Sequence, residues 1–410
     1  NFFQRNPNSS YKIKPPLNQM FYRFMANMMS LSTVGNRLMW GYKTYPKIYV
    51  IINLVTVIFG PIILVSQLFY LYFNYSDLKF DVLGVIFSIF PATCLANVDI
   101  FSSKIKSYTQ ISRDFLSKIH IYNVYKYDKS EFIKNKLLFV ERSSRYTSFY
   151  MIFFYTFNWL SWILMTAVNN YKNKELVHNQ TAKLQTCVFL WLPFDYSYDY
   201  RRWIVIHSIN CYIVLAGECA IMIYQSISNM FIYNLIGHIE ILKKKIKTAF
   251  IEDLSDEVAH SKLVEIIKYH TFILFKEVEK AFGINVTANY LQNLVGNSIV
   301  LYQITYGGKE NIVQYVTMVM AYTGGPIMMS LVIDELRKKT YDLSDIIYDI
   351  PWQNMSVSNQ KIVMIVLQKM QIIMDFKAFC GIRAGIAPMI SILKTTFSYY
   401  VMLESTVTVD

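Results

Sequence analysis

The sequence predicts an all-α membrane protein built from seven transmembrane helices. Of its 410 residues, 54% are hydrophobic and 17% are charged, whereas soluble domains carry about 25% charged residues. The positive mean hydropathy of +0.27 also indicates a membrane protein. Charge-poor apolar stretches of about 20 residues, the length that crosses a bilayer as a helix, recur along the sequence. We therefore expect one bundle of membrane helices.

The apolar stretches define the expected helices in order. The predicted spans are 48–75, 82–98, 146–168, 203–233, 281–308, 311–333 and 385–403. The fifth span is uncharged but rich in Asn and Gln, so one side of it should face protein and not lipid. The apolar stretch 357–379 is divided by Lys and Asp, and we interpret it as a cytosolic amphipathic helix before the last span.

The distribution of positive charge predicts the orientation. Segments 1–47, 102–145, 234–280 and 334–384 together hold 32 of the 40 Lys and Arg residues, and the alternate connections hold 7. Short cytoplasmic segments collect such residues, so the N-terminus should be cytoplasmic and the C-terminus extracellular. The sequons at Asn74 and Asn179 then lie outside and are predicted glycosylation sites.

The sequence lacks the common motifs of enzymes and metal sites. It has no phosphate-binding glycine loop, no nucleophile elbow and no zinc-protease motif, and its His and Cys residues show no metal-ligand spacing. We therefore predict no enzyme activity, no cofactor and no metal. The net charge of +12 is assigned to cytoplasmic loops at the lipid bilayer, and no nucleic-acid partner is expected.

The last quarter of the chain carries an ordered set of motifs. An Arg-Lys-Lys run at 337–339 precedes Tyr-Asp-Ile-Pro-Trp at 348–352 and Leu-Gln-Lys-Met-Gln at 367–371, and Ile-Leu-Lys-Thr-Thr-Phe-Ser-Tyr-Tyr begins at 392. This order resembles the insect odorant receptor family. The segment 234–280 is too short for the insert of the family's co-receptor, so the chain resembles a ligand-tuning subunit.

The resemblance implies a function and an assembly. It implies an odorant-gated nonselective cation channel in the plasma membrane of sensory-neuron dendrites, formed as a heterotetramer with the odorant receptor co-receptor. The chain divides accordingly into a cytoplasmic segment 1–47, the helices and ligand cavity at 48–333, a cytosolic anchor region at 334–384 and a pore-lining part at 385–410.

The resemblance also assigns pore and anchor residues. Four copies of the last helix would line the pore, and an apolar ring near its outer end can close a pore by dewetting. The predicted gate residues are Tyr399, Met402, Leu403, Ser405 and Thr406, with Glu404 at the pore mouth. The helical spacing of apolar residues in 357–379, with the Trp before it, gives the expected subunit-anchoring contacts, which are Trp352, Ile362, Val366, Met370 and Ile373.

A small volatile apolar ligand requires a largely hydrophobic cavity with one or two polar groups. The resemblance places it in the outer half of the second, third, fourth and sixth spans. The candidate ligand-binding residues there are Phe87, Phe90, Trp159, Trp162, His207, Cys211, Tyr212, Tyr315 and Tyr322. Two charged residues inside spans, Glu218 and Lys394, have either a functional or a packing role on the sequence alone.

Two other functional classes stay open on the residues. A seven-helix receptor that signals through a cytosolic partner at the basic segments 102–145 and 234–280 would give a response without a current of its own. A transporter would give saturable uptake, although no inverted repeat is visible in the sequence.

Overall fold

The computed structural model describes residues 13–78, 80–250, 254–272, 275–307, 309–372 and 374–407, and this part of the chain is helical. The α-helices of the described residues are α1 (Met20–Leu31), α2 (Lys47–Asn74), α3 (Phe80–Ser102), α4 (Lys106–Asp114), α5 (Tyr122–Tyr127), α6 (Glu131–Lys172), α7 (Lys174–His178), α8 (Tyr200–Ala249), α9 (Asp256–Phe272), α10 (Phe275–Tyr306), α11 (Ile312–Thr340), α12 (Leu343–Tyr348), α13 (Val357–Met370) and α14 (Ile386–Val407). All seven predicted spans fall on helices, so the all-α class is confirmed.

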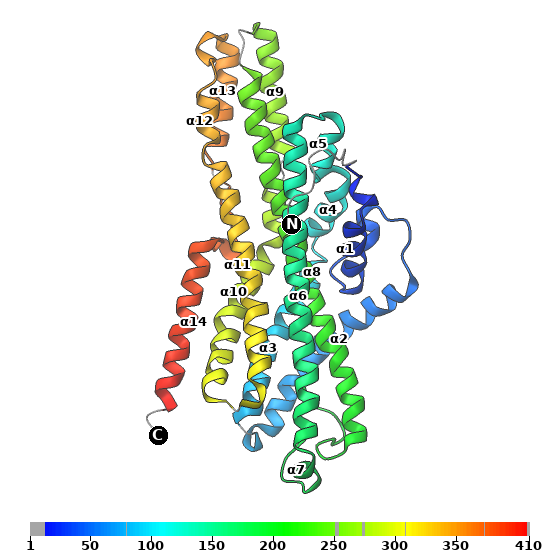
Figure 1. Ribbon diagram of the computed structural model, residues 1–410. Helices are drawn as coiled ribbons and strands as arrows, with labels where there is room; N and C mark the ends of the chain where they lie inside the picture. The colour runs from blue at the N-terminus through cyan, green and yellow to red at the C-terminus, as the bar shows by residue number, and fades with distance from the viewer. Residues whose placement is uncertain are drawn as a thin grey trace, which may run out of the picture.

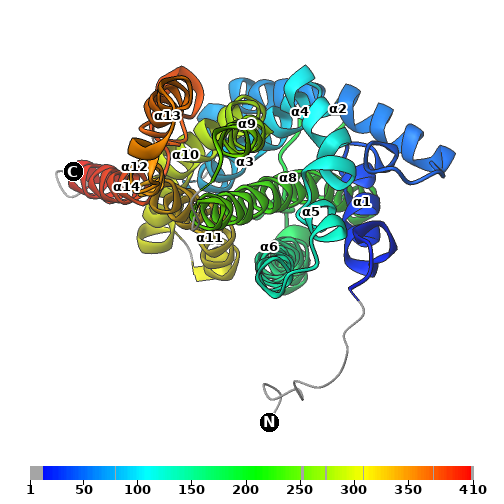
Figure 2. The ribbon, with the colours of Figure 1, turned by 90° about the horizontal axis from the view of Figure 1, so that it is seen from above.

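Figure 1 shows an elongated bundle, with α7 at one end and α9, α12 and α13 at the other. We call these the α7 end and the α13 end. Viewed along its axis, the bundle has α8 near its centre, while α14 and α2 lie at its edges (Figure 2). The described helices long and apolar enough to cross a membrane are those starting at Lys47, Val82, Glu131, Tyr200 and Ile312.

The fifth predicted span, now α10, is not among these five because polar amides interrupt its apolar character. Asn285, Asn289, Asn293 and Asn297 recur every four residues, so they share one helix face. All four are buried against protein, mainly between α3, α11 and α14. The expectation that one side of this helix faces protein is confirmed.

The segments between spans, expected to be loops, are largely helical. The helix α8 has 50 residues, which corresponds to about 75 Å at 1.5 Å per residue, far beyond the bilayer core of about 30 Å. At the α13 end, Glu240 of α8 pairs with Lys136 of α6 and, at 2.9 Å, with Lys339 of α11. Burial raises the pKa of Glu240, but the hydrogen bonds from the two lysines outweigh it and hold that pKa below its usual value.

The amphipathic helix expected at 357–379 is shorter than predicted, since α13 ends at Met370. After it the chain turns back on itself around Gly381, whose φ of 76° favours glycine. An antiparallel bridge joins Lys377 and Arg383, and the Ala384 amide donates to the Phe376 carbonyl at 2.9 Å. We call residues 374–385 the hairpin turn. It leads directly into α14.

Candidate functional site

A cavity of about 90 Å³ lies inside the bundle, which is room for several water molecules. Helices α2, α3, α6, α8 and α11 form its wall, together with one residue of the segment between α7 and α8. The lining residues are Thr56, Phe59, Gly60, Ile63, Ile89, Ala92, Thr93, Ala96, Asn97, Ile100, Asn158, Trp162, Val188, Tyr212, Ile213, Val214, Ala216, Gly217, Glu218, Ile221, Met318 and Tyr322. The wall is predominantly apolar, as expected for a small organic ligand.

One carboxyl group dominates the polar part of the wall. Glu218 is buried, and its Oε1 accepts hydrogen bonds from Asn158 Nδ2 at 2.6 Å and Tyr322 OH at 3.0 Å. Thr317 Oγ1 donates in turn to Asn158 Oδ1 at 3.1 Å. These residues come from α6, α8 and α11, so the cluster joins three helices at the cavity.

The second carboxyl oxygen, Glu218 Oε2, is buried and has no hydrogen-bond partner among the described residues. A buried polar atom without a partner is costly, and a ligand group that hydrogen-bonds it would remove that cost. A hydroxyl group fits because it can both donate and accept. The cavity wall therefore combines an apolar lining with one carboxyl group that has an unpartnered oxygen.

Three of the residues predicted from the sequence line this cavity. Trp162 and Tyr322 are buried in its wall. Tyr212 also lines it, although 41% of its surface is exposed, and its hydroxyl lies 3.1 Å from Thr56 Oγ1.

The other six predicted ligand residues do not line the cavity. Tyr315 packs edge-to-face on Trp162 at 6.1 Å, and Trp159 donates to the carbonyl of Cys211 at 3.1 Å. His207 stacks on Trp203 at 4.6 Å.

Of these six, Phe87 is exposed and Phe90 is half-buried. The lining residues of α8 run from Tyr212 to Ile221, whereas the predicted residues His207 and Cys211 precede them. On α3 the lining residues run from Ile89 to Ile100, deeper than the predicted outer half, whereas those on α6 and α11 lie within it.

Sequence reasoning missed the contribution of the first span. Thr56, Phe59, Gly60 and Ile63 of α2 line the cavity, although the site was expected on the second, third, fourth and sixth spans. Thr56 is one of few polar residues in an otherwise apolar helix, and this was the available signal. A β-carbon at Gly60 would lie 2.5 Å from Asn97 Oδ1, so any other residue there would have to displace the Asn97 side chain.

A buried line of hydrogen bonds connects the cavity to α14. The carbonyl of Tyr322, whose hydroxyl binds Glu218, accepts from Asn293 Nδ2 at 3.0 Å. The carbonyl of Asn293 accepts from Thr396 Oγ1 of α14 at 3.1 Å. Thr396 is buried although most of α14 is exposed on the surface of the chain.

The predicted gate residues lie near the end of α14. Tyr399 and Met402 are 45% and 53% exposed and Ser405 is exposed, so their side chains project from the subunit. The side chains of Leu403 and Thr406 lie outside the described residues.

The predicted pore-mouth residue Glu404 is half-buried, and its Oε1 accepts from Tyr306 OH of α10 at 2.8 Å. Lys394, further along α14 toward the α13 end, is exposed on the subunit surface. Neither Glu404 nor Lys394 lines the cavity.

The predicted anchor residues do not share one free face. Val366 and Met370 are buried in the core of the subunit itself, and Ile362 and Trp352 are partly buried. Ile373 lies outside the described residues. Because α13 packs on α9 and α12 through Val366 and Met370, these side chains are not free to meet a second subunit. The exposed apolar residues of α13 are Val357, Met364 and Ile365.

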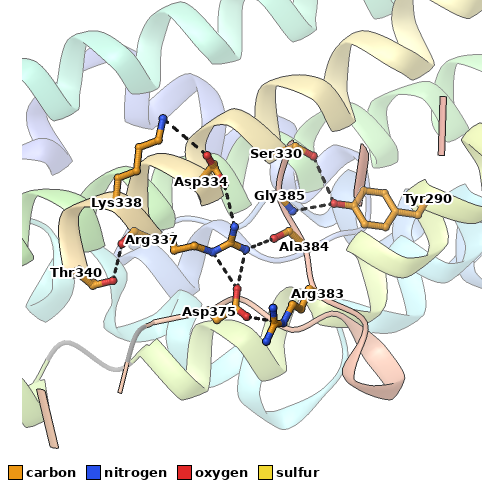
Figure 3. A network of polar contacts seen from close by, with 10 residues as sticks. All are labelled: Tyr290, Ser330, Asp334, Arg337, Lys338, Thr340, Asp375, Arg383, Ala384 and Gly385. Atoms are coloured by element: carbon orange, nitrogen blue, oxygen red, sulfur yellow. Dashed lines mark hydrogen bonds and ion pairs between the residues drawn. The ribbon is translucent and has the colours of Figure 1, made fainter. Parts of the chain in front are cut away.

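A charged cluster fixes the hairpin turn to the end of α11 (Figure 3). Arg337 Nε and Nη2 donate to Asp375 Oδ1 at 3.0 and 2.6 Å, and Nη2 also donates to the Ala384 carbonyl at 2.9 Å. Asp334 accepts from Arg337 Nη1 at 2.9 Å, and Arg383 pairs with the other oxygen of Asp375 at 3.0 Å.

A separate set of hydrogen bonds holds Gly385, the residue before α14. The Gly385 amide donates to Tyr290 OH of α10 at 3.1 Å, and that hydroxyl lies 3.4 Å from Ser330 Oγ of α11 (Figure 3). Helices α10 and α11 therefore hold the start of α14 from both sides.

The two predicted glycosylation residues are at the α7 end. Asn74 is the last residue of α2, is half-buried, and donates from its side chain to the Tyr70 carbonyl at 2.9 Å. Asn179 follows α7 and is exposed.

Comparisons with known proteins identify the family. The model of the family described as 7tm odorant receptor matches residues 120–397, more than half of the chain. The fold is similar to that of the insect olfactory receptor OR5 from Machilis hrabei, with a TM-score of 0.71 at 13% identity over 93% of this chain and 97% of that one.

A second structure of OR5 from Machilis hrabei, in complex with eugenol, matches equally, with a TM-score of 0.71 at 13% identity over 94% of this chain and 98% of that one. No curated protein matches the sequence. The matches identify a receptor and not an enzyme. The chain belongs to the insect odorant receptor family of membrane proteins.

Proposed function

We propose that this chain is the ligand-tuning subunit of an odorant-gated nonselective cation channel. The channel is a heterotetramer with the odorant receptor co-receptor in the plasma membrane of sensory-neuron dendrites. The N-terminus and the α13 end are cytosolic, in line with the excess of Lys and Arg in those segments. The α7 end, with Asn74 and Asn179, is extracellular and glycosylated.

The ligand is a small, mostly apolar molecule with one hydroxyl, held in the cavity against Glu218. The free oxygen of Glu218 and the apolar wall support this class of ligand. The OR5 receptor that shares the fold has been solved with eugenol, and eugenol is a phenol. Trp162, Tyr212 and Tyr322 contact the ligand.

The observation that carries the channel proposal is the hydrogen-bonded line from Glu218 through Tyr322 and Asn293 to Thr396. It joins the wall of the cavity to α14, the helix that would line the pore. A ligand opens a channel only if it binds the open arrangement more tightly than the closed one. A change in packing at Glu218 would therefore shift Thr396 and α14 through these hydrogen bonds.

In the assembled channel, the exposed side chains of α14 near Tyr399 and Met402 face the pore, with Leu403, Ser405 and Thr406 completing the gate. Glu404 stands at the outer mouth, where negative charge favours cations. The region 334–384 anchors the subunits to one another in the cytosol. Its exposed apolar residues Met364 and Ile365 are the ones available for that contact.

The test is whole-cell current in cells that express this chain with and without the co-receptor, during application of phenols, alcohols, esters and terpenoids. A fast nonselective cation current only in the co-expressing cells supports the proposal. A ligand-dependent cytosolic signal without current, with both chains at the cell surface, would favour the receptor that acts through a cytosolic partner.

The line to α14 gives a prediction of its own. Changing Thr396 to Val removes the hydroxyl that donates to Asn293, at nearly constant volume. We expect the ligand-evoked current per surface channel to fall about fivefold, the effect of one buried hydrogen bond of about 1 kcal/mol. The matched control is Thr395→Val, an exposed neighbour whose hydroxyl bonds within its own helix. Equal effects of both variants would contradict the proposed coupling.

A further inference from the structure

The segment between α7 and α8 covers the α7 end of the cavity, where a second, smaller cavity of about 20 Å³, lined in part by Gln185, Thr186 and Phe189, shares Trp162 with the first. Val188 of this segment lines the cavity, and its carbonyl accepts from Asn210 Nδ2 at 3.1 Å. Trp203 Nε1 donates to the Gln185 carbonyl at 2.7 Å. Because the residues from Thr186 to Leu190 are all buried, entry at this end would require the segment to leave its packed position.

The wall between α2 and α8 is much thinner. Phe59 and Tyr212 line the cavity, yet 51% and 41% of their surfaces are exposed on the outside of the subunit. These two side chains therefore belong both to the cavity wall and to the outer surface of the bundle. Helix α2 packs chiefly against α3 and α1, and the hydrogen bond between Thr56 and Tyr212 ties it to α8.

The exterior at this wall is lipid. The apolar part of α2 has a mean hydropathy of 2.6, and its large apolar side chains are mostly exposed on the outside of the bundle. A helix that is apolar on its outer face lies against the hydrocarbon of the bilayer. Small apolar molecules concentrate there from water, because their transfer to an apolar medium is favourable.

We propose that the cavity fills from the bilayer, through a lateral portal between α2 and α8 that the Thr56–Tyr212 hydrogen bond holds closed. We call this place the lateral portal, formed by Thr56, Phe59 and Tyr212. The inference rests on the proposed function of the cavity as the ligand site. It adds the route of entry and a specificity step, because a ligand must first dissolve in lipid.

The test follows entry of an apolar probe without any channel current. The full chain is reconstituted in liposomes, and 3-trifluoromethyl-3-phenyldiazirine, a small apolar photoreactive molecule, is added to the bilayer. A light flash after a variable delay attaches the probe, and mass spectrometry measures labelling of the cavity residues Ala92 and Ile221. The half-time of labelling reports the rate of entry.

We expect Tyr212→Phe and Thr56→Val each to shorten this half-time about fivefold, since each removes the same hydrogen bond. The double variant should be no faster than either single variant, because only one bond is lost. Tyr72→Phe, a lipid-exposed change on the same helix, should leave the half-time unchanged.

A substitution that loosens the segment between α7 and α8 tests entry at the α7 end instead. Trp203→Phe removes the bond to Gln185 and should not alter the half-time. If Trp203→Phe accelerates labelling and the two portal variants do not, the ligand enters at the α7 end and the portal is refuted. Missing label in the cavity at all delays would refute it as well. A labelled chain that gives no odorant current would refute the channel and keep the portal.

Discussion

Changing Glu218 to Gln should lower the affinity for a hydroxyl-bearing ligand about tenfold and leave its methyl ether unaffected. The substitution keeps the Oε1 that accepts from Asn158 and Tyr322, but an amide nitrogen replaces the free Oε2. That nitrogen donates only, so a ligand hydroxyl can no longer donate to this position and can only accept from a neutral amide, which is a weaker hydrogen bond than one to a carboxylate. A factor of ten corresponds to about 1.4 kcal/mol, within the range for hydrogen bonds to carboxyl groups.

Dose–response curves for eugenol and for its methyl ether, recorded from the same cells, would measure this difference. The ether serves as the internal control because it fills the same space without the hydroxyl proton. Equal losses for both molecules would mean that Glu218 acts in packing alone. Glu218→Leu should reduce both responses, because it leaves Asn158 and Tyr322 without their acceptor inside the bundle.

The second large effect is expected at the charged cluster around Arg337, which holds the hairpin turn that precedes α14. Arg337→Ala removes the donors to Asp375, Asp334 and the Ala384 carbonyl together. Both carboxylates are mostly buried, at 20% and 19% exposure, and losing one partner of such a pair costs about 2–3 kcal/mol after allowance for solvent. The hairpin turn would then separate from α11.

Because the hairpin turn leads into α14, Arg337→Ala should reduce the ligand-evoked current at least about tenfold and lower the midpoint of thermal unfolding in detergent. Arg337→Lys should restore part of both, since one ammonium keeps the charge but not the forked geometry. Lys338→Ala is the matched control, because Lys338 is 69% exposed and its ammonium group lies 3.8 Å from Asp334, too far for a hydrogen bond. A loss of current equal to that of Arg337→Ala in this control would contradict the role of the cluster.

Much of the fold could be predicted because bilayer thickness fixes the length of an apolar helix. The uncharged run that became α2 (Lys47–Asn74) was predicted within one residue at each end. Helical segments outside the bilayer have no such limit on their length, and α8 continues well past its predicted span. The amphipathic helix was predicted to continue to residue 379, but α13 ends at Met370 and the chain turns back around Gly381, held by the Arg337–Asp375 pair.

The candidate site was predicted only in part, for a different reason. Residue type marked Trp162, Tyr212 and Tyr322, because aromatic side chains commonly line apolar cavities. The depth of the cavity depends on how the helices pack, and a single sequence does not contain the packing of α2 on α3. Glu218 was recognised as unusual from its charge inside a span, and its partner Asn158 became visible only in three dimensions.

The polar face of α10 bears on how the cell makes this protein. A helix with a ladder of asparagines partitions poorly into lipid, and the cost falls only when neighbours satisfy the amides. Those neighbours include Asp99 of α3 and Gln225 of α8, which are synthesised earlier. We therefore expect α10 to enter the membrane only after these helices are in place, and substitutions at Asp99 or Gln225 to lower the amount of receptor at the cell surface before they affect the response to a ligand.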